Sequence, residues 1–356
     1  MSKIRVLELC ESYGGGVKTQ LDFLNTYLDK KKFDFVVMVS SKRENGIPSD
    51  YIIEDKLSEI KNPIKFLESL MSINKVVKKN QVQIVHAHST IAGIAMVLYK
   101  MIFFSKIPVI FTPHAYYSEM DRGVLKNGIL RLIERFMNHF FSCVIHVSKE
   151  EEGYALRSNL VAGKKSVVVN NGVPKQELVN QSHKETTFIN VARCADQKNP
   201  SKFIDLAQII LNELDCKFVW VGDGPLLESC RAKVKKLDLD SKIKFVGYSN
   251  NVASYLKKAD VYLSTSRYEG LPFSVLEALS YGLPLLLTDI IGHKSLVKNN
   301  GYLLSDSDKP YQIKKRAADI LENEESYSAA SLELYSSEYS IEKMINGIQK
   351  VYLSNI

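Results

Sequence analysis

The sequence has few cysteines, and they form neither a disulfide framework nor a metal-binding pattern. The five cysteines are scattered without any CxxC spacing, at positions 10, 143, 194, 216 and 230. An odd number without a framework excludes a disulfide-stapled secreted domain and is typical of a reduced protein. The sequence therefore predicts a cytoplasmic location.

The sequence also lacks an apolar run long enough to cross a membrane. Its longest apolar stretch, residues 91–111, is interrupted by Lys100, Lys106 and the Pro108 turn, which predicts a buried helix followed by a strand. The opening MSKIRVLELC is too short for a signal peptide and is typical of a first strand. With 45% hydrophobic and 24% charged residues over 356 positions, we expect two globular domains.

Excess charge is missing from the second half of the chain. Residues 1–174 hold 24 Lys and Arg against 17 Asp and Glu, whereas residues 175–356 hold 23 of each. All of the net charge of +7 therefore lies in the first half, which suits an anionic membrane, a lipid-phosphate acceptor or an ordinary solvated surface. No recognised motif or aromatic stacking platform accompanies it, so no nucleic-acid partner is predicted.

Short apolar strands alternate with helical stretches along the whole chain, which predicts parallel, doubly wound α/β sheets. The sequence NNGVP at 170–174 interrupts this pattern before a polar run, and the alternation then restarts. We expect two Rossmann-like domains facing a central cleft, at 1–174 and 175–339, and a final helix in 340–356 that packs back on the first domain. The expected strands are 4–9, 34–39, 84–88, 109–112, 142–147, 166–169, 188–191, 217–221, 243–246, 261–264 and 285–287; among the expected helices are 17–28, 64–78, 91–104 and 128–140.

The most informative segment is RYEGLPFSVLEALSYGLPLLLTD, which begins at Arg267. Pro272 fits the first position of a helix running from Phe273 to about Tyr281. The N–H groups at such a start favour an anion, and Glu277 lies about one turn deeper on the same face as Phe273 and Ser274. This arrangement suits a phosphate beside a diol, and Glu269 precedes the helix within reach of a neighbouring sugar. The segment therefore points to a nucleotide sugar, although a helical glutamate is more often simply solvated.

Three other segments follow expected strands, where open parallel sheets bind their ligands. VARCADQKN places Arg193 at a strand end and Lys198 at a helix start, a pair of cations suited to a diphosphate. Gly222 in VGDGP permits close approach of a phosphate or base, and a structural turn explains it equally well. The backbone near Val246 in FVGY is placed to border a nucleobase.

The first half contributes a glycine loop and three histidines. Gly14–Gly16 follow the first expected strand and allow close approach of a ligand, but they do not form the GxGxxG pattern of a dinucleotide site. His86 and His88 lie on one face of a strand, and His114 follows another. Three histidines can bind zinc, but no other spacing matches a metal signature, so no metal is predicted. His114 alone suits contact with a sugar hydroxyl or acid–base work.

Taken in order, these segments make the chain resemble the retaining glycosyltransferases of family 4, which have the GT-B fold. The resemblance covers nearly the whole length, and its most specific part is the E-x7-E element in EGLPFSVLE. It implies that Glu269 holds the donor sugar and Glu277 the ribose hydroxyls. Phe273 and Ser274 would offer backbone donors to the phosphates.

For the remaining positions the resemblance implies a shared donor site. Arg193 and Lys198 would bind the diphosphate, Gly15 and Gly16 would offer backbone N–H groups near it, and His114 would contact the sugar near the reacting carbon. The family reaction moves a sugar from a nucleotide diphosphate with retained anomeric configuration and without a metal or other cofactor. The implied acceptor is a glycan on a lipid carrier at the inner face of the cell membrane, with peripheral contact to anionic lipid.

Two other classes of function remain open. A nucleotide-sugar epimerase or a phosphorylase would use the same two-domain plan. An epimerase requires acid–base carboxylates at the sugar C2, and a glycogen-type phosphorylase requires a lysine-bound pyridoxal phosphate. Neither pattern is evident in the sequence. A catalytically silent nucleotide-sugar-binding protein would be expected to lose some of Arg193, Lys198 and the two glutamates, and all four are present.

Overall fold

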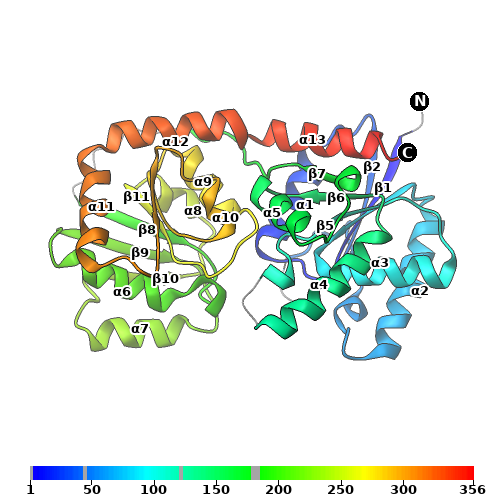
Figure 1. Ribbon diagram of the computed structural model, residues 1–356, viewed down its shortest axis with the longest axis horizontal. Helices are drawn as coiled ribbons and strands as arrows, with labels where there is room; N and C mark the ends of the chain where they lie inside the picture. The colour runs from blue at the N-terminus through cyan, green and yellow to red at the C-terminus, as the bar shows by residue number, and fades with distance from the viewer. Residues whose placement is uncertain (1–2, 43–45, 120–122, 178–184) are drawn as a thin grey trace. The chain divides into compact units, whose positions relative to one another are not determined.

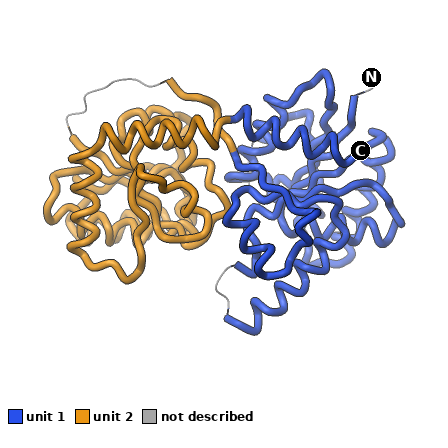
Figure 2. The backbone as a smooth tube through the Cα atoms, turned by 45° about the horizontal axis from the view of Figure 1, so that its top comes forward, with its two compact units in different colours: residues 1–171, 341–356 blue, residues 172–340 orange. Residues whose placement is uncertain are grey.

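The chain folds into two compact units in a computed structural model that describes residues 3–42, 46–119, 123–177 and 185–356. Unit 1 comprises residues 1–171 with 341–356, and unit 2 comprises residues 172–340 (Figure 2). The last helix thus belongs to the same unit as the start of the chain, and the polypeptide passes twice between the units.

Unit 1 is built on a seven-stranded parallel sheet in the order β3-β2-β1-β4-β5-β6-β7. Its strands are β1 (Ile4–Cys10), β2 (Phe33–Val39), β3 (Ile52–Ile53), β4 (Ile84–His88), β5 (Val109–Thr112), β6 (Cys143–His146) and β7 (Ser166–Val168). Strand order runs outward in both directions from the β1–β4 pair. Right-handed crossovers therefore place α1 and α3 on opposite faces, and ligands of such sheets bind beyond the strand ends at this reversal.

The helices of unit 1 form a layer on each face of this sheet. They are α1 (Gly15–Tyr27), α2 (Pro63–Lys79), α3 (Ser89–Phe103), α4 (Val124–His139), α5 (Lys149–Arg157) and α13 (Ile341–Leu353), with short 3-10 turns η1 (Asp55–Ser58), η2 (Tyr117–Glu119) and η3 (Gly163–Lys165). α13 packs beside α1, whereas α3 lies between α2 and α4 (Figure 1). Strand β4 and most of β1 are buried between the two layers, including the polar side chains of Glu8, His86 and His88.

Unit 2 repeats the plan with a six-stranded parallel sheet in the order β10-β9-β8-β11-β12-β13. Its strands are β8 (Thr186–Val191), β9 (Cys216–Val221), β10 (Ile243–Gly247), β11 (Val261–Ser264), β12 (Leu285–Thr288) and β13 (Gly301–Leu304). Its helices are α6 (Pro200–Leu211), α7 (Leu227–Lys236), α8 (Val252–Leu256), α9 (Phe273–Ser280), α10 (Ile291–Lys294), α11 (Pro310–Glu322) and α12 (Glu324–Glu338), with the 3-10 turn η4 (Asp196–Lys198). The reversal of strand order lies between β8 and β11.

The core of unit 2 is aromatic. Trp220, the only tryptophan of the chain, is fully buried between Phe203 and Phe245, and its indole N–H donates to the Ala192 carbonyl at 3.0 Å. Because Ala192 directly follows β8, this bond fixes the loop that carries the candidate phosphate-binding cation Arg193.

The doubly wound α/β fold predicted from strand–helix alternation is confirmed, with some local differences. Pro272 is the residue before α9 rather than its first residue, and α4 begins at Val124 instead of Gly128. The short edge strands β3 and β13 were not predicted, nor was α12, which has no clear apolar stripe. Across the described ranges, no helix is long and apolar enough to cross a membrane.

Candidate functional site

The carboxyl edge of the unit 2 sheet gathers the residues that the sequence singles out. Arg193 follows β8, Gly222 follows β9, Val246 lies in β10, and the segment from Glu269 to Glu277 follows β11. All of these strands are parallel, so their carboxyl ends lie along one edge of the sheet. Ligands of open α/β sheets bind at such an edge, beside the reversal of strand order.

Helix α9 presents its start and one carboxylate at this edge. In its first turn the Val275 N–H donates to the Pro272 carbonyl at 3.1 Å, whereas the Ser274 N–H makes no backbone hydrogen bond within the described residues and so favours an anion. Glu277 lies one turn further along, half-buried, and its side chain makes no hydrogen bond within the described residues. Burial raises the pKa of the Glu277 carboxyl to about 7. A desolvated carboxylate without a protein partner is a group placed to bind a ligand.

Glu269 is held by the loop that carries Lys198. The Lys198 ammonium forms an ion pair with Glu269 Oε1, and Gln197 Nε2 lies 3.5 Å from Glu269 Oε2 and 3.1 Å from the Tyr268 carbonyl. The Thr265 hydroxyl bonds the carbonyls of Lys198 and Asn199 at 2.9 and 3.0 Å, which ties this loop to the end of β11. The structure therefore joins two predicted site residues, Lys198 and Glu269, in one contact.

Gly292 explains how close α10 comes to this loop, and sequence reasoning did not identify it. A Cβ at Gly292 would lie 2.4 Å from the Glu269 carbonyl oxygen and 2.5 Å from that of Gly270. Only glycine permits this approach. Such a position is invisible to sequence analysis, because Gly292 lies 23 residues from Glu269 in an unremarkable IGHK segment.

Arg193 is exposed, two residues after the end of β8. Trp220 and the β9 turn hold the Arg193 backbone, but its guanidinium has no hydrogen-bond or ion-pair partner in the described parts of the chain. An unpaired arginine at a ligand-binding edge is well suited to bidentate recognition of a phosphate.

Gly222 and Gly224 have a structural explanation. Both have φ between 140° and 158°, and a Cβ on either would collide with backbone of residues 192–194, at 2.0 Å for Gly222 and 2.4 Å for Gly224. The turn therefore buttresses the loop carrying Arg193. Val246 is half-buried, and its carbonyl accepts from Arg231 Nη2 at 3.1 Å, so one of its backbone groups is already engaged.

Unit 1 has a glycine-rich helix start at the carboxyl end of β1. Helix α1 begins at Gly15, where φ is 56°, a left-handed value that favours glycine. Gly15 and Gly16 are exposed, and a Cβ on Gly15 would meet no atom within 4 Å. The first-turn N–H groups of α1 are therefore open to a ligand, as the sequence predicts for a close approach of backbone to an anion.

Beside this helix start, a chain of hydrogen bonds leads to His114. His114 follows β5, is half-buried, and has φ of 62°, an uncommon conformation for a side-chain-bearing residue. Its Nε2 lies 3.2 Å from His88 Nδ1, and His88 Nε2 lies 2.7 Å from Glu8 Oε2. Burial, followed by the charge of neighbouring His88, holds the pKa of His114 well below its usual value.

The same buried cluster includes side chains from three other positions, which are Tyr352, His86 and Thr112. Tyr352 of α13 donates to Glu8 Oε1 at 2.5 Å and lies 2.7 Å from His86 Nδ1, while His86 Nε2 lies 2.8 Å from the Thr112 hydroxyl. Burial alone would raise the pKa of Glu8, but hydrogen bonds and charge from the two histidines bring it down to about 2. Glu8 is therefore the ionised acceptor of the cluster.

An ionised Glu8 fixes the tautomers of the histidines in turn. His88 must donate through Nε2 to Glu8, so His88 Nδ1 accepts, and His114 must donate through Nε2. The remaining ring nitrogen of His114, Nδ1, is then a hydrogen-bond acceptor. Sequence reasoning identified His114 but not Glu8, whose signal was a lone acid within the apolar strand IRVLELC.

Glu8, His86 and His88 are also close enough to hold a metal ion, with one ligand atom of each within 4.8 Å of the others. Every one of these contacts is nevertheless accounted for by a donor and an acceptor in the neutral-histidine arrangement. The 2.7 Å separation of His88 Nε2 and Glu8 Oε2 is that of a direct hydrogen bond. The cluster is therefore explained as a positioning network, and His114, not part of this set, lies at its open end.

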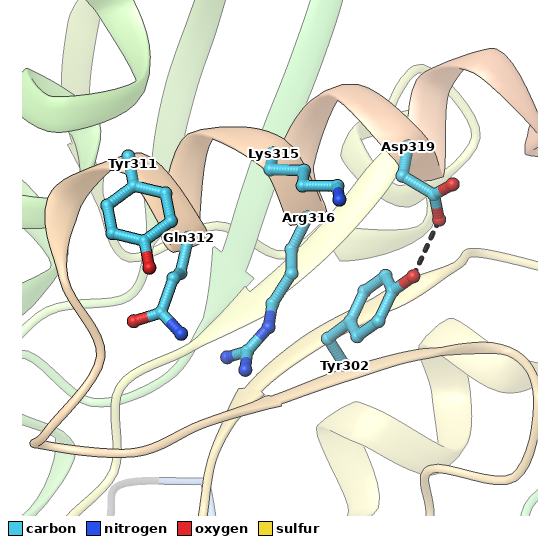
Figure 3. A pocket seen from close by; sticks show the side chains of 6 residues that line it. All are labelled: Tyr302, Tyr311, Gln312, Lys315, Arg316 and Asp319. Atoms are coloured by element: carbon cyan, nitrogen blue, oxygen red, sulfur yellow. Dashed lines mark hydrogen bonds between the residues drawn. The ribbon is translucent and has the colours of Figure 1, made fainter.

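A hollow lies away from these residues, beside the edge strand β13 (Figure 3). In it the Tyr302 hydroxyl donates to Asp319 at 2.7 Å, and Arg316 forms an ion pair with Asp308. Its main polar groups thus already have protein partners, so this hollow is not the candidate site.

The folded units and their sites define a class of enzyme, and comparison with known families agrees with it. Residues 14–177 match the family described as Glycosyltransferase Family 4, and residues 174–333 match that described as Glycosyl transferases group 1. The chain therefore belongs to the group 1 glycosyltransferases of family 4 and is a sugar transferase with the GT-B fold.

Among characterised proteins, the chain is similar to two transferases of Escherichia coli. It is 28% identical over 309 residues to UDP-Gal:alpha-D-GlcNAc-diphosphoundecaprenol alpha-1,3-galactosyltransferase, covering 79% of this chain and 78% of the relative. It is 27% identical over 296 residues to the O-antigen biosynthesis glycosyltransferase WbnH, with 83% of each chain covered.

Solved structures share the fold. The Anabaena protein HepE in complex with UDP superposes with a TM-score of 0.76 at 16% identity over the full length of both chains. The lipopolysaccharide outer core galactosyltransferase WaaB superposes with the same score and identity, again over both full lengths. At this identity the likeness establishes the GT-B fold of the chain.

Proposed function

We propose that this enzyme transfers a sugar from a nucleotide diphosphate sugar to a lipid-linked glycan, an intermediate of a surface polysaccharide such as O-antigen, capsule or exopolysaccharide. The observation that carries the donor class is Glu277, a half-buried carboxyl without a protein partner, one turn beyond the start of α9. A carboxylate there suits the vicinal hydroxyls of a ribose, while the helix start suits the attached phosphate. The E. coli relative is named for a UDP-Gal donor and a diphosphoundecaprenol-linked acceptor, which supports the same classes here.

In the proposed reaction, the bond between the sugar C1 and the diphosphate oxygen breaks, and a bond from C1 to an acceptor hydroxyl oxygen forms on the same face. The acceptor proton passes to the departing phosphate oxygen, so the products are the glycoside with retained configuration and a nucleoside diphosphate. Arg193, Lys198 and the α9 start would stabilise the charge that develops on the diphosphate. No metal or other cofactor enters this scheme.

Glu269 would hold hydroxyls of the transferred sugar, and its ion pair with Lys198 links it to the diphosphate site. A phosphate that binds Lys198 would compete with this ion pair. It would thereby free a carboxylate oxygen of Glu269 to accept hydrogen bonds from the sugar. His114, with Gly15 and Gly16, belongs to unit 1, and we assign it by resemblance to the sugar near the reacting carbon. Its Nδ1 acceptor, fixed by the Glu8 network, would receive a hydrogen bond from a sugar hydroxyl.

The test of the donor class is a thermal-shift titration of the wild type and Glu277→Ala with UDP, GDP, ADP and their sugar conjugates. We expect one nucleotide to raise the Tm of the wild type, with and without EDTA, and the rise to vanish in Glu277→Ala. Glu322→Ala, an exposed glutamate at the end of α11, is the matched control and should keep the wild-type shift.

No Tm shift with any nucleotide, or an equal shift in both proteins, would remove the basis for this donor site. A nucleotide-specific shift without sugar transfer to any acceptor would instead favour the silent binding protein. The anomeric configuration of the product, measured by NMR coupling constants, separately tests retention. Release of an epimerised nucleotide sugar without an acceptor would instead identify an epimerase.

A further inference from the structure

Helix α4 of unit 1 is amphipathic with its apolar side turned outward. Five large apolar side chains follow helical spacing along one stripe and are exposed, from 79% at Leu125 to 45% at Ile133. The stripe consists of Leu125, Ile129, Leu132, Ile133 and Phe136. A surface helix ordinarily points such a stripe into the core, so this one has the reverse of the usual orientation.

Polar contacts hold α4 in this orientation. Glu134, buried against the unit, accepts hydrogen bonds from the backbone N–H of Ser118, at 3.2 Å, and from its hydroxyl. One turn on, Asn138 is also buried and its amide donates to the Leu160 carbonyl at 3.1 Å. Because these buried groups would lose their partners if the helix rotated, the exposed stripe is a fixed feature of the fold.

Cations flank the stripe. At 100° per residue, Lys126 lies to one side of it and Arg131 and Arg135 to the other, and all three are exposed. None of them has an ion-pair partner among the described residues, and the only acid of the helix, Glu134, faces inward. An apolar stripe between unpaired cations is the pattern of a helix that lies in the surface of a lipid bilayer.

We propose that α4 docks unit 1 onto an anionic lipid bilayer, with the stripe inserted among the lipids and Lys126, Arg131 and Arg135 bound to phosphate headgroups. Unit 1 as a whole carries 26 Lys and Arg against 18 Asp and Glu, which complements such a surface. A second copy of the chain is a poorer occupant, because two-fold pairing of the stripes would bring two sets of cations together.

This docking deepens the proposed function and rests on it only in that a lipid-linked acceptor gives the surface its purpose. Binding to vesicles requires no nucleotide and no acceptor. Loss of nucleotide binding with intact vesicle binding would count against the donor proposal alone, and the converse would count against the docking alone.

The experiment is co-sedimentation of the full chain with phosphatidylglycerol–phosphatidylcholine vesicles and with pure phosphatidylcholine vesicles, at low and high salt. We expect binding to the anionic vesicles that falls with salt and is weakened about tenfold or more by Arg131→Glu with Arg135→Glu, and by Leu132→Ser with Phe136→Ser. The control Lys235→Glu with Lys236→Glu makes the same charge change on the exposed side of α7 in unit 2 and should bind as the wild type. Because all substituted side chains are exposed, each variant should keep the wild-type Tm.

The single tryptophan allows a second readout. Trp220 is fully buried in unit 2, so Phe136→Trp adds a reporter whose signal is separate from a constant background. We expect its emission to shift to the blue and to be quenched by brominated lipids, whereas Tyr311→Trp on α11 should show neither effect. Unchanged vesicle binding in both double variants, or stripe variants that dissociate a dimer while binding vesicles normally, would overturn the proposal.

Discussion

The two units share one architecture but present different surfaces. Unit 1 carries an excess of eight positive charges, whereas unit 2 has 21 Lys and Arg against 22 Asp and Glu. Of the 22 large apolar side chains that are exposed in the described residues, 19 belong to unit 1. A common fold therefore does not fix the surface, and the surface of each unit reflects what that unit meets.

About half of the lysine and arginine side chains of unit 2 form ion pairs within that unit. Among the described residues, eleven ion pairs between Lys or Arg and a carboxylate lie in unit 2 and four in unit 1. Arg193 and Glu277 have no ion-pair partner among the described residues, and they lie at the carboxyl edge of the sheet, where we propose that they bind the ligand. Fewer of the described lysines and arginines of unit 1 form such ion pairs, which leaves unit 1 with an excess of positive charge suited to an anionic partner such as a bilayer.

Among the substitutions that test this difference between the units, Arg193→Ala in unit 2 should have the largest effect on activity. Removing the unpaired cation at the end of β8 should lower kcat/KM about 1000-fold, because it removes stabilisation of the charge developing on the diphosphate. The kcat/KM of Arg193→Lys should lie between those of Arg193→Ala and the wild type, since an ammonium cannot bind a phosphate in the bidentate way. Steady-state kinetics with the donor identified by thermal shift provide the measurement.

Lys235→Ala is the matched control, because it deletes an exposed cation on α7 of the same unit. It should leave kcat/KM within twofold of the wild type. Equal losses in Arg193→Ala and Lys235→Ala would mean that net charge of unit 2, and not a defined phosphate contact, governs the rate.

Sequence reasoning located the elements that carry strong local patterns. The bounds of β4, β5 and β11 agree with the structure to the residue, because each is a short apolar run bounded by polar or turn residues. β13 was missed because it is a four-residue edge strand, and α12 because EESYSAASLELYSSE shows no apolar stripe. The parallel, doubly wound class of the sheets was predicted from the strand–helix alternation, whereas the strand order within each sheet comes from the structure.

The residues of the candidate site also fall into two groups: those that a local motif predicts and those that only the folded structure brings together. Residues within one motif, such as Glu269 and Glu277, are found from sequence because a helix start fixes their spacing. The hydrogen bond between Tyr352 and Glu8 joins residues 344 positions apart, so no local sequence pattern predicts it. The apolar spacing of α4 predicts a helix, but the direction of its stripe depends on the bonds of Glu134 and Asn138 to distant loops, and only the structure shows these.

A smaller and more selective effect is expected from Glu8→Gln in unit 1. The amide cannot accept from both His88 and Tyr352 as the carboxylate does, so the tautomer of His114 is no longer fixed. We expect kcat to fall about tenfold while the nucleotide Kd stays within twofold, because Glu8 is not among the groups proposed to bind the nucleotide. Calorimetric titration with the nucleoside diphosphate and initial rates together give this split.

Tyr352→Phe separates positioning from stability for this network. It removes one bond to Glu8 but leaves the Glu8–His88–His114 chain, so Tm should fall while kcat is retained. If Tyr352→Phe lowered kcat as much as Glu8→Gln, the network would act through the stability of unit 1 and not through His114.

The smallest expected effect concerns the pH dependence of unit 1 stability. Glu151, fully buried in α5, accepts from the Val147 N–H at 2.8 Å, and burial raises the pKa of its carboxyl to about 8. Because the folded pKa lies above the unfolded value, the folded state binds the proton more tightly, and this contribution to stability is fully present only below the unfolded pKa of about 4.5 and is lost as pH rises from there to about 8. Glu151→Gln keeps the acceptor for Val147 but cannot ionise, so it should match the wild type in stability at pH 4 and exceed it by about 1 kcal/mol or more at pH 9. Thermal unfolding at the two pH values measures this, with Glu322→Gln in unit 2 as a control that should follow the wild type; a parallel decline in Glu151→Gln would assign the pH dependence to other groups.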